Sequence, residues 1–114
     1  MTTININTHE LNRETSLMMG YKYKYVLGSL VVQKPCEPSA MNHIWNPCGD
    51  ILTALEIVKK FTLHMHFNGV EWVVYTNFTS AGHVEARHAE LGIAICLSLI
   101  EHKHATEKYV KVQS

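Results

Sequence analysis

The residues best suited to chemistry lie on one face of an expected β-hairpin at positions 63–75. Strand alternation puts His64 and His66 on one side of the first strand, about 7 Å apart. A two-residue turn at Asn68-Gly69 would set Glu71 opposite His66, with Tyr75 further along the same face. These residues allow two interpretations. If His83 or His88 folds back onto them, they could form a metal site or an acid–base pair. Otherwise they are a solvated pair of polar residues on a half-exposed sheet. We take as candidate binding residues, without a catalytic or metal role, His64, His66, Glu71 and Tyr75.

The second concentration of reactive side chains is the stretch 34–49, which carries three prolines. Loops of this length in a compact domain are often functional. Cys36, His43 and Cys48 are zinc-ligand types, but no Cys-x-x-Cys pair or fourth ligand accompanies them, so we expect no metal. Trp45 either plugs the edge of the core or lies exposed at a partner surface. We add Trp45 and His43 to the candidate binding residues.

Signatures of catalysis and of phosphate binding are absent from the sequence. Asp50 is the single aspartate, and no Gly-x-Ser-x-Gly elbow occurs. The six glycines are scattered and form neither a Walker nor a dinucleotide fingerprint. We therefore expect a protein that is not an enzyme and that has no cofactor.

Charge and hydropathy exclude further classes of function. The 114 residues include ten basic and ten acidic ones, so no strong field attracts nucleic acid or an anionic membrane. No apolar run reaches the roughly 20 residues of a membrane helix, and the first residues do not resemble a signal peptide. We expect a cytoplasmic protein without a membrane partner. The alternating tyrosines and lysines of 21–25 fit a nucleic-acid surface or, more simply, a sheet-edge strand protected by charge.

Periodicity indicates two hairpins. In the hairpin at 63–75, an Asn68-Gly69 loop would pair Phe67 with Val70, Met65 with Trp72 and Leu63 with Val74 on one apolar face. In the stretch 21–33, a Gly28-Ser29 turn would pair residue 27 with 30 and residue 26 with 31.

Three helices complete the expected elements. The first spans about 8–19, and the second begins at Asn46-Pro47 or Asp50, with Ile51, Leu55 and Val58 on its apolar face and Ala54 beside them. A loop at 79–85 precedes the third helix, near 86–102, which is apolar on nearly every side. That helix must lie between the sheet and another layer or complete its burial in a homo-oligomer. We expect one domain over 1–114, with flexible ends at 1–6 and 105–114.

Four segments together resemble the phage ABA-sandwich domain family of small phage and prophage proteins. They are "ELNRETSLMMGYKY" (10–23), "NPCGDILTALEIVKKF" (46–61), "EWVVY" (71–75) and "AELGIAICLSLIEH" (89–102). The resemblance implies an α+β fold, a three-layer α-β-α sandwich with a small antiparallel sheet of about four strands and about three helices. It also implies a setting in a bacterial host cell.

Two classes of function follow from this setting. The first is a non-enzymatic phage or prophage accessory protein that binds a host protein, such as an immune effector, and inhibits a defence system. The alternative is a binder that sequesters a nucleotide signal among aromatic and histidine side chains. A metalloenzyme based on histidine is the third and weakest possibility.

Overall fold

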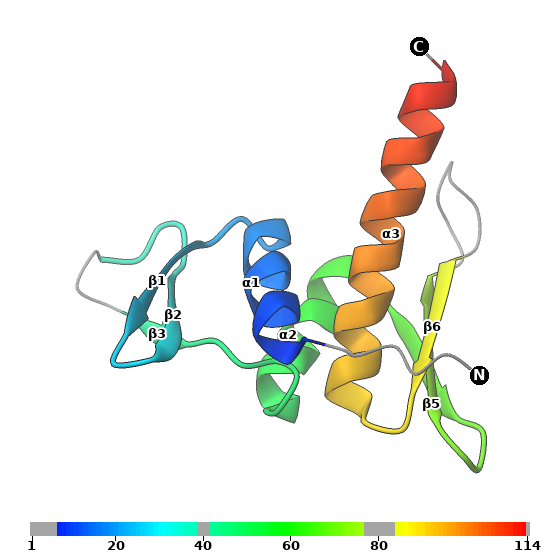
Figure 1. The fold of residues 1–114 in the computed structure, drawn as a ribbon, viewed down its shortest axis with the longest axis horizontal. Helices are drawn as coiled ribbons and strands as arrows, with labels where there is room; N and C mark the ends of the chain where they lie inside the picture. The colour runs from blue at the N-terminus through cyan, green and yellow to red at the C-terminus, as the bar shows by residue number, and fades with distance from the viewer. Residues whose placement is uncertain (1–6, 39–41, 77–83, 114) are drawn as a thin grey trace.

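The computed structural model describes residues 7–38, 42–76 and 84–113, and of residues 104–113 the backbone alone (Figure 1). The expected flexible end at 1–6 therefore lies outside the described residues, as does most of the expected loop at 79–85. In chain order the elements are α1 (Thr8–Met18), β1 (Lys22–Val26), β2 (Ser29–Gln33), β3 (His43–Ile44), α2 (Ile51–Phe61), β4 (His64–Phe67), β5 (Trp72–Thr76), β6 (Val84–His88) and α3 (Leu91–Gln113).

The strands form two antiparallel sheets, β1–β2–β3 and β4–β5–β6, of three strands each. The helices lie between them, with α1 against the first sheet and α3 against the second (Figure 1). The predicted α+β class, with three helices and antiparallel strands, is confirmed. The strands number six rather than four, and the layers run sheet, helices, sheet, because the first hairpin packs on α1 instead of joining the second. Within the described residues, no helix is long and apolar enough to cross a membrane.

Helix α3 forms the centre of the core. All residues from Gly92 to Cys96 are buried, as are Ser98 and Leu99. The sequence left two ways to bury a helix that is apolar on every side: between layers of one chain, or in a homo-oligomer. The structure shows the first. The homo-oligomer stays a prediction, and the apolar helix no longer argues for it. The largest fully buried side chains of the core, two of them on α3 itself, are Trp45, Ile57, Leu99, Ile95, Val32 and Val74.

The helix ends follow ordinary capping chemistry. The side chain of Asn7 caps α1 by accepting from Glu10 N at 3.2 Å. Asp50 caps α2, its Oδ1 accepting from Leu52 N at 3.2 Å. Of the two expected starts of the second helix, the later one is therefore correct.

The expected apolar face of α2 is partly correct, because Val58 packs against the core and Ala54 beside it is buried. Ile51 and Leu55 are exposed, whereas Ala54 and Ile57 are fully buried. The stripe that faces the core follows the spacing i, i+3, i+4, i+7 from Ala54 to Phe61, and this places Ile51 and Leu55 beside it rather than on it.

The β4–β5 hairpin has a longer turn than expected. Phe67 pairs with Trp72 and Met65 with Val74, so four residues, 68–71, form the loop. The side chain of Asn68 explains the difference, because its Oδ1 accepts from the backbone N of both residues 70 and 71, at 2.9 Å each. The shift of two residues preserves which side chains share a face.

The β1–β2 hairpin turns one residue earlier than expected. Val26 pairs with Ser29 and Tyr25 with Leu30, which leaves Leu27 and Gly28 as the two-residue loop. Both loop residues have positive φ, 51° and 83°, as a type I′ turn requires. The expected Gly28-Ser29 turn is wrong because a leucine occupies a left-handed position that propensity assigns to asparagine or glycine.

The last elements also differ from expectation. A strand, β6, covers 84–88 where a loop and a helix start were expected, and α3 begins at Leu91. The backbone of the helix continues to Gln113, and the expected flexibility of 105–114 stays a prediction.

Candidate functional site

The outer face of the second sheet gathers three of the six candidate binding residues. The ring of His64 stacks on that of Tyr75, with centroids 5.2 Å apart and planes 20° apart, and the His66 ring meets the same tyrosine edge-on at 6.0 Å. Strand pairing sets His64 directly opposite Tyr75. We call these three residues the histidine face.

Glu71 and His88 do not complete the histidine face. His66 pairs with Val73, not with Glu71, which lies in the four-residue turn. His88 belongs to the opposite face of the sheet, where its Nδ1 accepts from Glu90 N at 2.9 Å. His83 lies outside the described residues.

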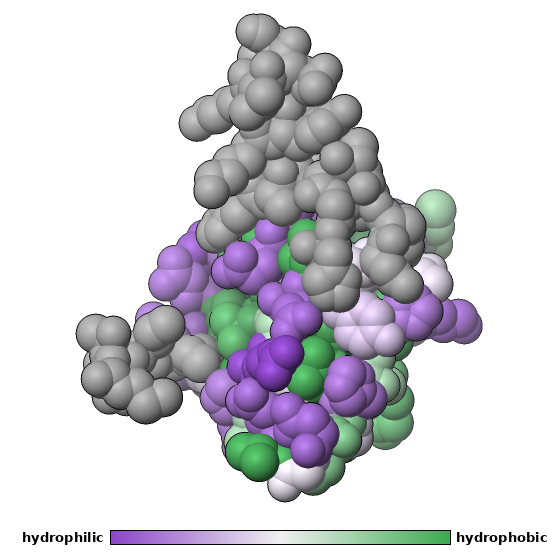
Figure 2. Space-filling view, turned by 90° about the vertical axis from the view of Figure 1, so that its right-hand side faces the viewer, coloured by the Kyte–Doolittle hydropathy of each residue, from purple (hydrophilic) through white to green (hydrophobic). Residues whose placement is uncertain are grey.

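Two charged residues that sequence reasoning missed lie on the same face of β6. Arg87 Nε donates to Glu85 Oε2 at 2.6 Å, and this hydrogen bond raises the pKa of the guanidinium. The alternation Val84, Glu85, Ala86, Arg87 could have revealed them, because the first and third are buried and the others exposed. Figure 2 views the molecule from this side, where hydrophilic and hydrophobic residues alternate over the described part of the surface.

The histidine face can stack on a planar group, and the guanidinium of Arg87 on the neighbouring strand can attract an anion. Among the residues that the structure describes, no group of three or more histidine, cysteine or acidic residues could hold a metal ion. The two rings that would stack on a ligand already contact each other, so any ligand would bind at their edges or displace one ring.

The two candidate binding residues of the stretch 34–49, Trp45 and His43, lie in different environments. Trp45 is 2% exposed and fills the core, where its Nε1 donates to Thr15 Oγ1 at 3.2 Å. Its ring also meets Tyr21 edge-on at 5.3 Å. His43 lies half-buried on β3, with Nε2 2.7 Å from Glu37 Oε2. Of the two positions considered for Trp45, the structure shows the one in the core, which a partner cannot reach.

An exposed aromatic surface lies instead on residues 22–33, which we call the tyrosine hairpin. Tyr25 and Val26 are exposed, and Tyr23 meets Tyr25 edge-on at 6.0 Å. At the tip, the side chain of Leu27 is 102% exposed. Sequence reasoning recognised the alternation of tyrosine and lysine here but missed the leucine, because it expected the turn one residue later.

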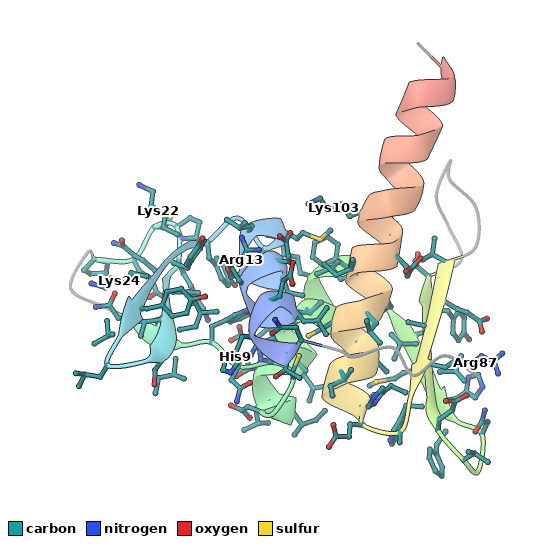
Figure 3. The ribbon with its side chains drawn as sticks, in the orientation of Figure 1. His9, Arg13, Lys22, Lys24, Arg87 and Lys103 are labelled. Atoms are coloured by element: carbon teal, nitrogen blue, oxygen red, sulfur yellow. The ribbon has the colours of Figure 1, made fainter. Side chains whose placement is uncertain are left out.

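Lysines accompany this aromatic surface. Lys22 and Lys24 are exposed on β1, on the face opposite to the tyrosines. Figure 3 shows both at the end of the molecule away from Arg87. The tyrosine hairpin and the histidine face are thus two separate surfaces, one on each sheet.

Comparison with family models, with characterised proteins and with solved structures finds no match to this chain. The resemblance to the phage ABA-sandwich family therefore stays a prediction from the sequence segments that carry it.

Proposed function

We propose that this chain is a non-enzymatic binding protein that docks onto a partner protein through the tip of the tyrosine hairpin. The observation that carries the proposal is Leu27, which combines full exposure with a left-handed backbone at φ 51°. A β-carbon in that conformation costs about 1–2 kcal/mol, and exposure returns no hydrophobic gain. Local strain of this kind is typical of ligand clamps and other functional sites.

The neighbours of Leu27 fit the same role. Tyrosine is enriched among the residues that dominate interface energetics, and Tyr25 is 55% exposed beside the tip. Lysine ammonium groups on β1 favour a partner whose apolar pocket has an acidic rim. We infer that the leucine enters the pocket and that the lysines set orientation and association rate.

The identity of the partner rests on the sequence resemblance. A small phage or prophage protein that binds without catalysis is suited to occupy a host protein, and an effector of bacterial immunity is the partner class that we propose. On this proposal the chain works as an inhibitor in the cytoplasm of the host cell.

Capture from bacterial lysate by the tagged full chain tests the proposal. Leu27→Asn removes the apolar tip, and Val70→Asn is the matched control, because Val70 is 79% exposed in the turn of the other hairpin. We expect a stoichiometric protein that the wild type and Val70→Asn retain and that Leu27→Asn loses. Equal retention by all three chains, or by none, contradicts docking at the tip.

A second candidate function is the binding of a nucleotide at the histidine face. The stacking of His64 on Tyr75, near the exposed Arg87, favours it. Thermal unfolding with a panel of nucleotides tests it: a stabilisation that His64→Ala abolishes supports this function, and the absence of any shift excludes it over the concentrations used.

A further inference from the structure

Two thiols that lie far apart in the sequence meet inside the molecule. The Sγ atoms of Cys48, in the loop before α2, and Cys96, on α3, are 3.7 Å apart across 48 positions of sequence. Both cysteines are free thiols. Cys48 is half-buried, whereas Cys96 is fully buried.

The backbone around the two thiols is held close by a glycine. Gly92 precedes Cys96 by four residues, so both lie on one face of α3. A Cβ at position 92 would lie 2.4 Å from Pro47 O and 2.8 Å from Cys48 O, and only glycine allows this approach. The loop therefore lies directly on the helix, and the side chain of Cys48 reaches Cys96.

The same loop is fixed from its other side by α1. The buried Asn12 accepts at Oδ1 from Cys48 N, at 3.1 Å, and donates from Nδ2 to Asn46 Oδ1, at 2.9 Å. Cys48 Sγ also lies 3.9 Å from Thr8 O. The closeness of the two sulfurs is thus a property of the packed interior rather than of a mobile surface side chain.

We propose that Cys48 and Cys96 form a redox-active dithiol, which low-molecular-weight disulfides such as oxidised glutathione convert into an intramolecular disulfide. The sulfurs need to approach by about 1.7 Å to reach the bond length of about 2.05 Å. This site is independent of the partner surface on the tyrosine hairpin, and it adds a modification to the proposed binding function.

The reaction has two exchange steps. The Cys48 thiolate attacks one sulfur of oxidised glutathione, whose S–S bond breaks, and one glutathione leaves as a thiolate. Cys96 then loses its proton and attacks Cys48 Sγ, which breaks the mixed disulfide and releases the second glutathione. Two protein thiols are oxidised, one oxidised glutathione is reduced to two thiols, and the two protons end on the released glutathione molecules.

The surroundings of the two sulfurs set the order of the two steps. The S–H of Cys96 donates to the ionised Cys48, and this hydrogen bond lowers the pKa of Cys48 although burial opposes it. The same hydrogen bond and burial raise the pKa of Cys96. Cys48, the less buried of the two cysteines, is therefore the attacking group, and Cys96 is the resolving thiol.

The disulfide would tie the loop before α2 to the central helix. Closing a covalent loop of this length restricts the unfolded chain, so we expect an increase in Tm of about 10 °C. Because the bond would join segments that already contact each other, the fold should not change.

The test uses the full chain with Cys36→Ser, which removes the exposed third thiol. After native incubation with oxidised glutathione, we expect a mass loss of two hydrogens, a peptide link between positions 48 and 96, and a rise in Tm that dithiothreitol reverses. Two thiols that still alkylate, a retained glutathione or a dimer linked between chains would overturn the proposal.

Two further variants in the same background assign the steps. Cys96→Ala removes the resolving thiol, so one glutathione per chain should remain bound at Cys48. Cys48→Ala leaves only the buried thiol and should take up no glutathione. Rapid glutathione uptake by Cys48→Ala would contradict the assigned order, and the parent chain gives a result even if either variant fails to fold.

Discussion

Replacing Leu27 by asparagine should stabilise the isolated protein while removing the side chain with which it binds. Leu27 has φ 51°, and Asn is several-fold enriched over other non-glycine residues in this backbone region. A five-fold preference corresponds to about 1 kcal/mol. The side chain is 102% exposed, so its removal loses no burial to offset this gain.

The expected size of the effect follows from the length of the chain. Unfolding entropy of about 2.1 cal/mol/K per residue over 114 residues gives about 240 cal/mol/K, so 1 kcal/mol raises Tm by about 4 °C. Thermal and urea unfolding of the purified chain measure this directly, with equal m-values in urea as the sign that only stability has changed.

Two controls separate strain from hydrophobicity. Leu27→Ala removes the apolar atoms but keeps a β-carbon in the left-handed conformation, so we expect no gain in stability. Val70→Asn makes the same change of chemistry at an exposed turn residue without positive φ, and should also give no gain. A Leu27→Asn chain no more stable than the wild type would refute the claim that the tip is strained.

Three further predictions concern the core. Gly92→Ala should destabilise the protein by about 2 kcal/mol in urea unfolding, because the clash with Pro47 O outweighs the gain of about 1 kcal/mol in helix propensity; a gain in stability would contradict the close packing. Asn12→Ala should lower the free energy of unfolding by about 2 kcal/mol in the same assay, because it leaves the N–H of Cys48 without its acceptor. A loss below about 0.5 kcal/mol would indicate that water replaces the amide. Burial raises the pKa of the Tyr21 hydroxyl above its usual 10, although Lys34 opposes this shift. The contribution of Tyr21 to the free energy of unfolding is therefore complete below pH 10 and is lost as the pH rises through the pKa of the folded state. Tyr21→Phe should reduce the loss of stability at alkaline pH in unfolding measurements, and an unchanged dependence of stability on pH would contradict this.

Alternation alone was enough to predict which residues share a face of the second sheet. Met65, Phe67, Trp72 and Val74 lie together as expected even though their pairing shifts by two residues, because a shift of two preserves the side of the sheet. Turn length could not be predicted in the same way. It depends on the two hydrogen bonds that the Asn68 side chain accepts, which compete with the two-residue turn.

In the candidate sites, too, the contacts within one sheet could be predicted from the sequence and the contacts between distant segments could not. The grouping of His64 and His66 with Tyr75 follows from a period of two and was predicted. The pairing of Cys48 with Cys96 joins segments 48 positions apart, and it depends on how the loop before α2 lies on α3. No local sequence pattern indicates how that loop packs on the helix. The one hint is Gly92, which lies one turn before the buried Cys96.

The leucine at the hairpin tip was missed for a different reason. Propensity favours glycine or asparagine wherever φ is positive, so a sequence-based choice moves the turn to Gly28-Ser29. The structure violates this preference at Leu27. Local rules fail most often at functional or strained positions, which is why this violation supports a binding role.

The most direct test of docking through the tip is site-specific photo-crosslinking in living bacterial cells. A photoreactive amino acid replaces Leu27 in one chain and Val70 in another, so that both probes are exposed at hairpin turns. We predict one protein adduct of defined mass from position 27 and none from position 70. Absence of an adduct at position 27, or the same adducts from both positions, would contradict the central claim that this protein binds its partner through the tyrosine hairpin.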